Sequence, residues 1–146
     1  MKSLFVLLIF LITFTGSQAN SIPIYNEKNN SSIQLAILLD TSSSMDGLID
    51  QAKSQLWKIV NELAVSKKNG KSIELFVALY EYGNDGLSPQ EGYIRKITPF
   101  TQDLDKISDE LFKLKTNGGQ EYCGQVIQDA ISNLQWNKSN DELKII

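Results

Sequence analysis

The sequence predicts an α/β domain: a doubly wound, Rossmann-like, mostly parallel sheet with helices on both faces. Continuous apolar runs bounded by polar loops indicate strands that are buried on both faces. Between them lie segments whose apolar side chains recur at helical spacing. The expected order is strand, helix, strand, strand, helix, helix, strand. With 146 residues, the chain is long enough for one ordinary domain and too short for two.

The first half of this pattern begins with an apolar strand. Ile33 to Leu39 is almost continuously apolar and ends at Asp40, as expected of a strand in a parallel sheet. The hydroxyl-rich segment 41–44 is expected to form a loop. A helix is predicted from about Met45 to Lys67, with apolar residues at helical spacing. Asn69-Gly70 is expected to end it.

The second half predicts two more strands before two helices. Ser72 to Tyr82 is the second apolar strand, and Tyr93 to Ile97 is a short, charged strand expected at an edge and compatible with an antiparallel direction. Helices are predicted over 103–115 and from about Glu121 to Leu134. A closing strand begins near Leu143, so the sheet is expected to be incomplete at its C-terminal end.

The N-terminal residues carry the pattern of an export signal. Lys2 precedes a short apolar run, and small residues at positions 17 and 19 fit signal-peptidase cleavage after Ala19. Residues 1–19 are therefore predicted to be a signal peptide, with a retained N-terminal anchor as the alternative. Residues 20–32 are expected to be a polar leader, and 33–146 the folded domain. The mature chain, without a transmembrane span, is expected in the periplasm, on the cell surface or secreted.

Composition narrows the chemistry that this chain can perform. The sequence has no His, which excludes Ser-His-Asp triads and His-ligated zinc. Its single Cys excludes an intrachain disulfide and a thiolate metal cluster. A net charge of −3 argues against a nucleic-acid partner. Carboxylates, hydroxyls, lysines and oxygen-bound cations remain.

The chemically informative segment is the loop that follows the first strand. Asp40, Ser42 and Ser44 stand at alternate positions where strand gives way to helix, so their oxygens can converge on one point. One carboxylate and two hydroxyls suit a hard cation, above all Mg²⁺, which retains several waters. From spacing alone a helix cap is equally plausible, because Ser43 and Asp46 have capping-box spacing.

Asp40-Thr41-Ser42-Ser43-Ser44-Met45 resembles the D-x-S-x-S motif of the von Willebrand factor type A domain. The resemblance extends over about residues 33–146, because the predicted elements follow the family's order. It implies a metal-ion-dependent adhesion site that binds Mg²⁺, or Mn²⁺ or Ca²⁺, through Asp40, Ser42 and Ser44. The family's second loop usually adds a Thr after Gly-Gly. Here Glu121 is the nearest oxygen donor and is the fourth expected ligand, with a helix N-terminal acid as the alternative.

The resemblance implies an exported binding module whose cation is bridged by a carboxylate from a protein ligand. No nucleophile–base pair accompanies the motif, so the chain is not expected to be an enzyme. One alternative is a degenerate, metal-free assembly domain. A less favoured alternative is a phosphatase-like α/β enzyme with Asp40 as nucleophile, but such enzymes need an acid at the position of Ser42. The family's third ligand loop would follow the closing strand, so the sequence is expected to be a C-terminally truncated fragment.

Overall fold

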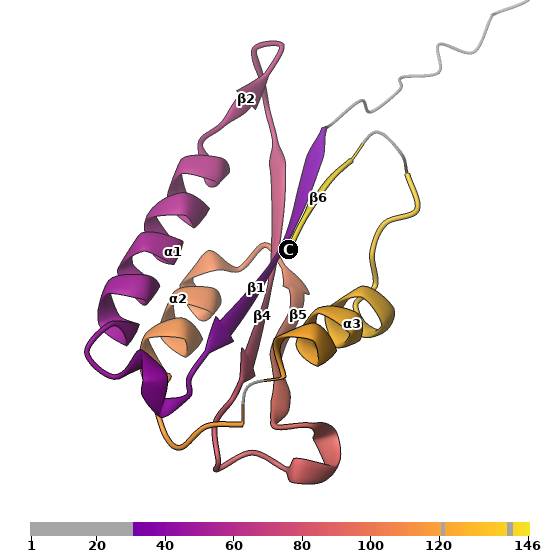
Figure 1. Ribbon diagram of the computed structural model, residues 1–146. Coiled ribbons are helices and arrows are strands. Elements are labelled where there is room, and N and C mark those ends of the chain that lie inside the picture. The colour runs from indigo at the N-terminus through magenta and orange to yellow at the C-terminus, as the bar shows by residue number, and fades with distance from the viewer. Residues whose placement is uncertain (1–30, 121, 140–141) are drawn as a thin grey trace, which may run out of the picture.

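A computed structural model describes residues 31–120, 122–139 and 142–146 (Figure 1). The predicted signal peptide, nearly all of the leader and Glu121 lie outside the described residues. The elements in chain order are β1 (Ser32–Asp40), α1 (Ile49–Ala64), β2 (Lys67–Lys68), β3 (Lys71–Ser72), β4 (Glu74–Tyr82), β5 (Ile94–Thr101), α2 (Leu104–Lys113), α3 (Cys123–Asn133) and β6 (Leu143–Ile145), with short 3-10 turns at Ser43–Met45 and Pro89–Glu91.

The main sheet has the strand order β5-β4-β1-β6. β1 and β4 are parallel and paired along their whole length, from Ser32 opposite Glu74 to Asp40 opposite Tyr82. β6 is also parallel to β1, whereas β5 runs antiparallel to β4 at the edge. The predicted α/β class, the mostly parallel sheet and the edge position of the charged strand are confirmed.

Helices cover both faces of this sheet, as predicted (Figure 1). α1 and α2 pack on one face over the larger hydrophobic cluster, and α3 packs on the other. Because every second side chain of a strand points to the same face, β1 and β4 supply apolar residues to both clusters. The larger cluster includes Ile37, Leu39, Val60, Leu79, Ile107 and Leu111, and the smaller one includes Ala36, Ala78, Tyr80, Val126 and Ala130.

The first helix is shorter than the sequence predicts at both ends. It begins at Ile49 instead of Met45, because Gly47 adopts a left-handed φ of 79° that an α-helix does not allow. It ends at Ala64 instead of Lys67. The expected stop, Asn69-Gly70, is instead the tip of the β2–β3 hairpin, where both residues have positive φ.

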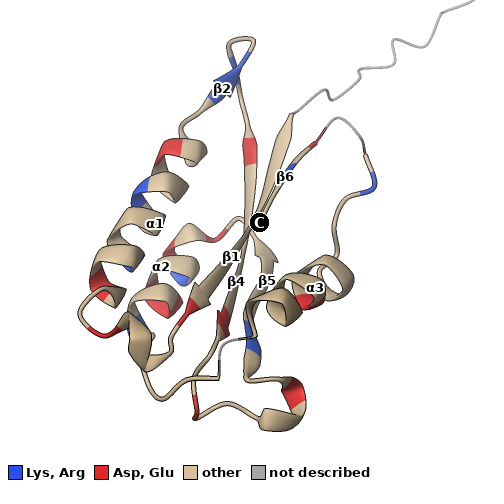
Figure 2. Ribbon diagram, in the orientation of Figure 1, with Lys and Arg blue, Asp and Glu red and all other residues tan. Residues whose placement is uncertain are grey.

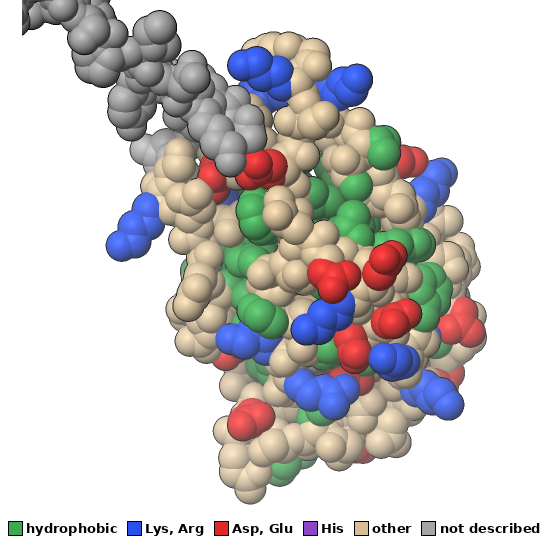
Figure 3. Space-filling model, turned by 180° about the vertical axis from the view of Figure 1, so that it is seen from behind, with side chains coloured by type: hydrophobic (Ala, Val, Ile, Leu, Met, Phe, Trp, Pro, Cys, Tyr) green, Lys and Arg blue, Asp and Glu red, His purple; other side chains and the backbone are tan. Residues whose placement is uncertain are grey.

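Basic residues are concentrated at the β2–β3 hairpin. The hairpin tip carries Lys67, Lys68 and Lys71, seen as blue at the top of Figures 2 and 3. Over the rest of the face shown in Figure 3, basic and acidic side chains are interspersed. No helix in the described part of the chain is long and apolar enough to cross a membrane.

The β6 side of the sheet carries an apolar groove. β6 pairs only with Ile33–Leu35, so among the described residues β1 has no neighbour on that side beyond Leu35. A groove of about 370 Å³ follows this free edge. It is lined mainly by apolar side chains of β1, α1, α3 and β6, including Leu38, Leu56, Ile59, Ile127 and Ile145.

Tyr80 is the largest fully buried side chain and lies in the α3-side cluster. Burial, and secondarily the nearby carboxylate of Asp129, raise the pKa of Tyr80 to about 12. The phenol oxygen has no hydrogen-bond partner among the described residues, so we ascribe the effect of Asp129 to its charge. Tyr80 is therefore held in its neutral form by the fold.

This raised pKa predicts a loss of stability at high pH. An unfolded tyrosine loses its proton near pH 10, so between pH 10 and 12 the folded state retains a proton that the unfolded state releases. Stability therefore falls as pH rises through this window, by about 1.4 kcal/mol per pH unit. In urea unfolding, Tyr80→Phe should remove this part of the slope. Tyr93→Phe, at the half-buried Tyr93 that stacks on Tyr122, should keep it. A Tyr80→Phe slope equal to that of the wild type would contradict the assignment.

Candidate metal centre

The predicted ligand loop begins at the carboxyl end of β1. Asp40 is the last residue of the strand, and the amide of Thr41 donates to the carbonyl of Tyr82 at 2.9 Å, which extends the contact with β4 by one residue. The chain then turns through Ser43–Met45 and reaches α1 at Ile49. Asp40, Ser42 and Ser44 are thus placed where the parallel strands end, the usual ligand-binding edge of such sheets.

The three predicted ligand side chains are brought together by this turn. Asp40 Oδ1 accepts a hydrogen bond from the amide of Ser42 at 2.8 Å, and the hydroxyl oxygens of Ser42 and Ser44 are 2.8 Å apart. Oδ2 of Asp40 has no hydrogen bond with any described residue. Ser42 is fully buried, whereas Ser44 is exposed and Asp40 partly exposed. One carboxylate and two hydroxyls therefore lie together at the end of the strand.

The capping alternative does not describe this loop. Neither the 3-10 turn nor α1 has a side-chain hydrogen bond at its N-cap, which is Ser42 in the turn and Leu48 in the helix. The Asp46 carboxylate instead accepts a hydrogen bond from the hydroxyl of Thr116. The hydrogen bond between Asp46 and Thr116 therefore joins the ligand loop to the segment before the Gly-Gly pair.

The segment 116–120 lies directly against the ligand loop. The amide of Asn117 donates to the carbonyl of Thr41 at 3.0 Å, and the amide of Ser43 donates to the carbonyl of Gly118. A methyl group on Gly119 would lie 3.1 Å from Cβ of Ser42, closer than ordinary contacts. The Gly-Gly turn thus meets the D-x-S-x-S loop as the resemblance implies. The expected fourth ligand, Glu121, lies outside the described residues.

A third loop, which follows β4, closes on Asp40 from the other side. Gly83 has a φ of 79°, and a Cβ atom there would lie 2.8 Å from Asp40 Oδ1. Its amide donates to the carbonyl of Tyr93 at 3.0 Å. Asp85, two residues on, accepts a hydrogen bond from the amide of Gly119 at 3.2 Å. Only glycine can therefore occupy position 83 without strain and without displacing the Asp40 carboxylate.

Beneath these loops lies a buried carboxylate that the sequence analysis did not identify. Glu81 of β4 is 2% exposed. Its Oε1 accepts hydrogen bonds from the Thr41 hydroxyl at 3.0 Å and from the Asn84 amide group at 3.3 Å, and its Oε2 pairs with Arg95 at 2.5 Å. The signal in the sequence is an acidic residue near the carboxyl end of an apolar strand that is expected to be buried.

Acidic residues surround the candidate centre without forming a carboxylate cluster. Asp46 and Asp85 contact its loops, and the ribbon in Figure 2 shows acidic positions at the lower end of the molecule, where β1 and β4 end. Among the described residues, no three acidic or cysteine side chains are arranged to hold a metal ion. Any cation here would therefore depend on a mixture of carboxylate and hydroxyl oxygens.

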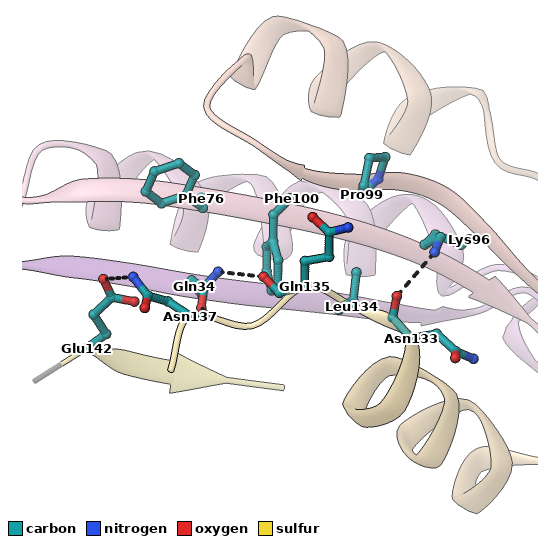
Figure 4. Close-up of a pocket in the computed structure, with 10 residues that line it drawn as sticks. All are labelled: Gln34, Phe76, Lys96, Pro99, Phe100, Asn133, Leu134, Gln135, Asn137 and Glu142. Atoms are coloured by element: carbon teal, nitrogen blue, oxygen red, sulfur yellow. Dashed lines mark hydrogen bonds between the residues drawn. The ribbon is translucent and has the colours of Figure 1, made fainter. Parts of the chain in front are cut away.

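A larger cavity of about 620 Å³ lies elsewhere, beside Gln34 near the start of β1 (Figure 4). Its floor includes Phe76 and Phe100, and its rim is formed by the α3–β6 connection. The side chain of Gln34 holds that connection against β1 with two hydrogen bonds. It accepts from the amide of Asn137 at 2.8 Å and donates to the carbonyl of Gln135 at 3.5 Å. The cavity contains none of the predicted ligands, and Gln34 is satisfied within the chain.

No protein-family model matches this sequence, and a search of curated proteins finds no match. Solved structures do match. An uncharacterized protein from Alicyclobacillus acidocaldarius superposes with a TM-score of 0.52 at 22% identity, over 70% of this chain and 40% of that chain. The vWF domain of the type V pili tip protein Mfa5 from Porphyromonas gingivalis gives a TM-score of 0.56 at 14% identity, over 80% of this chain and 37% of that chain.

A second structure of Mfa5, with its three N-terminal domains, gives a TM-score of 0.50 at 16% identity over 70% of this chain and 18% of that chain. This chain therefore spans less than half the length of each of these structures. At such low identity the likeness concerns the fold alone. The described residues have an α/β fold similar to that of a von Willebrand factor type A domain.

Proposed function

We propose that this chain is an exported, cation-dependent protein-binding module of the adhesion type. The observation that carries the proposal is the joint placement of Asp40, Ser42 and Ser44 at the carboxyl end of β1. A carboxylate oxygen with no hydrogen bond among the described residues lies on the same short turn as two hydroxyls 2.8 Å apart. The von Willebrand factor A-like fold and the presence of a pilus tip protein among the structural neighbours support a role in protein binding.

The donor chemistry favours Mg²⁺, with Mn²⁺ or Ca²⁺ as substitutes. Mg²⁺ prefers oxygen ligands and is commonly bound by one or two carboxylates while it keeps several waters. Asp40 would supply the charged oxygen, and Ser42 and Ser44 the neutral ones. We include Glu121 as a fourth ligand, because it follows the Gly-Gly turn that packs on Ser42. The bound cation would present an open coordination position to a partner.

We propose that the partner fills this position with a carboxylate. The Asp40 carboxylate and two neutral hydroxyls alone would leave a divalent cation with a net charge of about +1, which attracts an anion, and a bound Glu121 carboxylate would reduce that charge. The cation then acts as a bridge, and the proposal involves no catalytic step. The position that a phosphatase-like enzyme would need for its acid is occupied by Ser42, which is buried and hydrogen-bonded to Ser44.

The first prediction concerns cation-dependent stability. Mg²⁺ or Mn²⁺ should raise the melting temperature of the intact protein, because binding to the folded state adds about 1.4 kcal/mol at ten times Kd. Asp40→Asn should abolish this rise: the amide oxygen can still accept from Ser42, but the charge is lost. Differential scanning calorimetry with and without EDTA measures both effects.

Asp109→Asn provides the matched control for this experiment. Asp109 is an exposed carboxylate on α2, away from the three loops, so its variant should keep the full cation response. If the wild type folds and shows no response to either cation, the metal-binding proposal is wrong and the metal-free assembly domain is favoured. An equal loss of response in both variants would indicate a general charge effect.

The second prediction compares two glycines with the same backbone conformation. Gly83 and Gly47 both have φ near 79°, but a Cβ at Gly83 meets Asp40 Oδ1 at 2.8 Å, whereas at Gly47 it meets nothing within 4 Å. Each change to Ala should cost about 1–2 kcal/mol of stability from the left-handed conformation. Gly83→Ala should in addition weaken Mn²⁺ binding, because it displaces the Asp40 carboxylate.

Isothermal titration calorimetry gives the Mn²⁺ affinity of both variants. Gly47→Ala should bind with the wild-type affinity despite its lower stability. Equal affinities for Gly83→Ala and Gly47→Ala would show that the position of Asp40 does not determine cation binding.

A further inference from the structure

We infer that Glu81 is a positioning residue: its buried carboxylate holds together the three loops that surround the candidate metal centre. The inference rests on the proposed function for its effect on cation binding. That Glu81 holds the three loops together rests only on the hydrogen bonds described below. The three loops are the ligand loop after β1, the loop after β4 and the segment 115–120, and Glu81 reaches each of them directly or through one side chain.

The ligand loop is attached to Glu81 through Thr41. This residue stands between Asp40 and Ser42, and its fully buried hydroxyl donates to Glu81 Oε1 at 3.0 Å. The same hydroxyl lies 3.2 Å from the carbonyl of Tyr82. The Thr41 side chain is thus held against Glu81, while Asp40 and Ser42 on either side of it make the contacts within the ligand loop.

The other two loops are attached through Asn84. Its side-chain amide group donates to Glu81 Oε1 at 3.3 Å and to the carbonyl of Lys115 at 3.1 Å. Asn84 Oδ1 in turn accepts from the side chain of Asn117 at 3.4 Å, and the amide of Asn117 donates to the carbonyl of Thr41 at 3.0 Å. These bonds form a closed circuit that starts and ends at Glu81.

A single counter-ion makes this arrangement possible. A carboxylate that is 2% exposed must be compensated by a charge and by hydrogen bonds. Arg95 on β5 supplies the charge at 2.5 Å from Oε2, which leaves Oε1 for the two neutral donors. Its side chain is 56% exposed, so the pair extends from the interior to the surface. Arg95 of β5 thus orients the Glu81 carboxylate, which accepts hydrogen bonds from Thr41 and Asn84 of the two loops.

The test uses small changes that preserve the fold. Thr41→Val removes the hydroxyl and keeps the shape, so it breaks the bond to Glu81 and the hydroxyl contact with the carbonyl of Tyr82, which still accepts from the Thr41 amide. Thr41→Ser restores the hydroxyl. Glu81→Gln keeps an acceptor for Thr41 but places an amide group against Arg95. Val60→Ala, on the buried face of α1, is the control for a general loss of stability.

Two measurements are made on the intact protein. The first is Mn²⁺ affinity, from the electron paramagnetic resonance signal of the free ion. Changes to groups that orient metal ligands weaken affinity by about tenfold to a hundredfold, and this is expected for Thr41→Val and Glu81→Gln. The second is hydrogen exchange at the amides of Ser43 and Asn117, which bridge the loops and should exchange faster in both variants. Thr41→Ser and Val60→Ala should match the wild type in both.

The outcomes separate this inference from the proposed function. A folded wild-type protein that binds no Mn²⁺ overturns the proposed function, and with it the effect assigned to Glu81. A wild type that binds Mn²⁺, with unchanged affinity and exchange in Thr41→Val and Glu81→Gln, overturns this inference alone. Weaker binding in Val60→Ala, equal to that in Glu81→Gln, also overturns it, because stability would then account for the loss.

Discussion

The parallel pairing of β1 with β4 is the constraint on which the rest of the structure depends. The two strands are matched from Ser32 opposite Glu74 to Asp40 opposite Tyr82, so they end at the same edge of the sheet. A register shift of one residue would turn every side chain to the other face and expose both hydrophobic clusters. The same register pairs Leu39 with Glu81 and leaves Thr41, two residues farther on, within hydrogen-bond distance of that carboxylate, so core packing and loop geometry depend on one set of backbone hydrogen bonds.

Much of this fold is predictable from the sequence because strands and helices have different apolar periods. The run from Ile33 to Leu39 indicates a doubly buried strand, and its end at Asp40 locates the ligand loop. Where prediction fails, single-residue backbone conformation is the reason. The left-handed Gly47 delays α1, and Asn69-Gly70 forms a hairpin tip where a helix stop was expected. Periodicity carries no information about such φ values.

The candidate site is predictable only in part, because its supporting residues lie far apart in the sequence. Asp40, Ser42 and Ser44 form a local pattern, and the Gly-Gly turn is also visible. The contact between Thr41 and Glu81 spans 40 positions, and that between Asn84 and Lys115 spans 31. Such contacts follow from strand order, which the sequence alone does not specify. The role of Glu81 therefore follows from the pairing of β4 with β1, which brings its carboxylate to Thr41.

The local charge balance of the candidate centre bears on the proposed function more directly than its fold does. One fold can carry many activities, so the argument must come from the site. Three loops meet at Asp40, yet the carboxylates of Asp46 and Asp85 are directed to Thr116 and Gly119. Each of these two carboxylates thus has a hydrogen-bond partner outside the proposed ligand set. With one carboxylate and two hydroxyls, a divalent cation bound as we propose would retain excess positive charge, which would favour a partner's carboxylate. Each further carboxylate ligand would reduce that attraction, so a bound Glu121 would weaken the affinity of the proposed centre for an acidic partner.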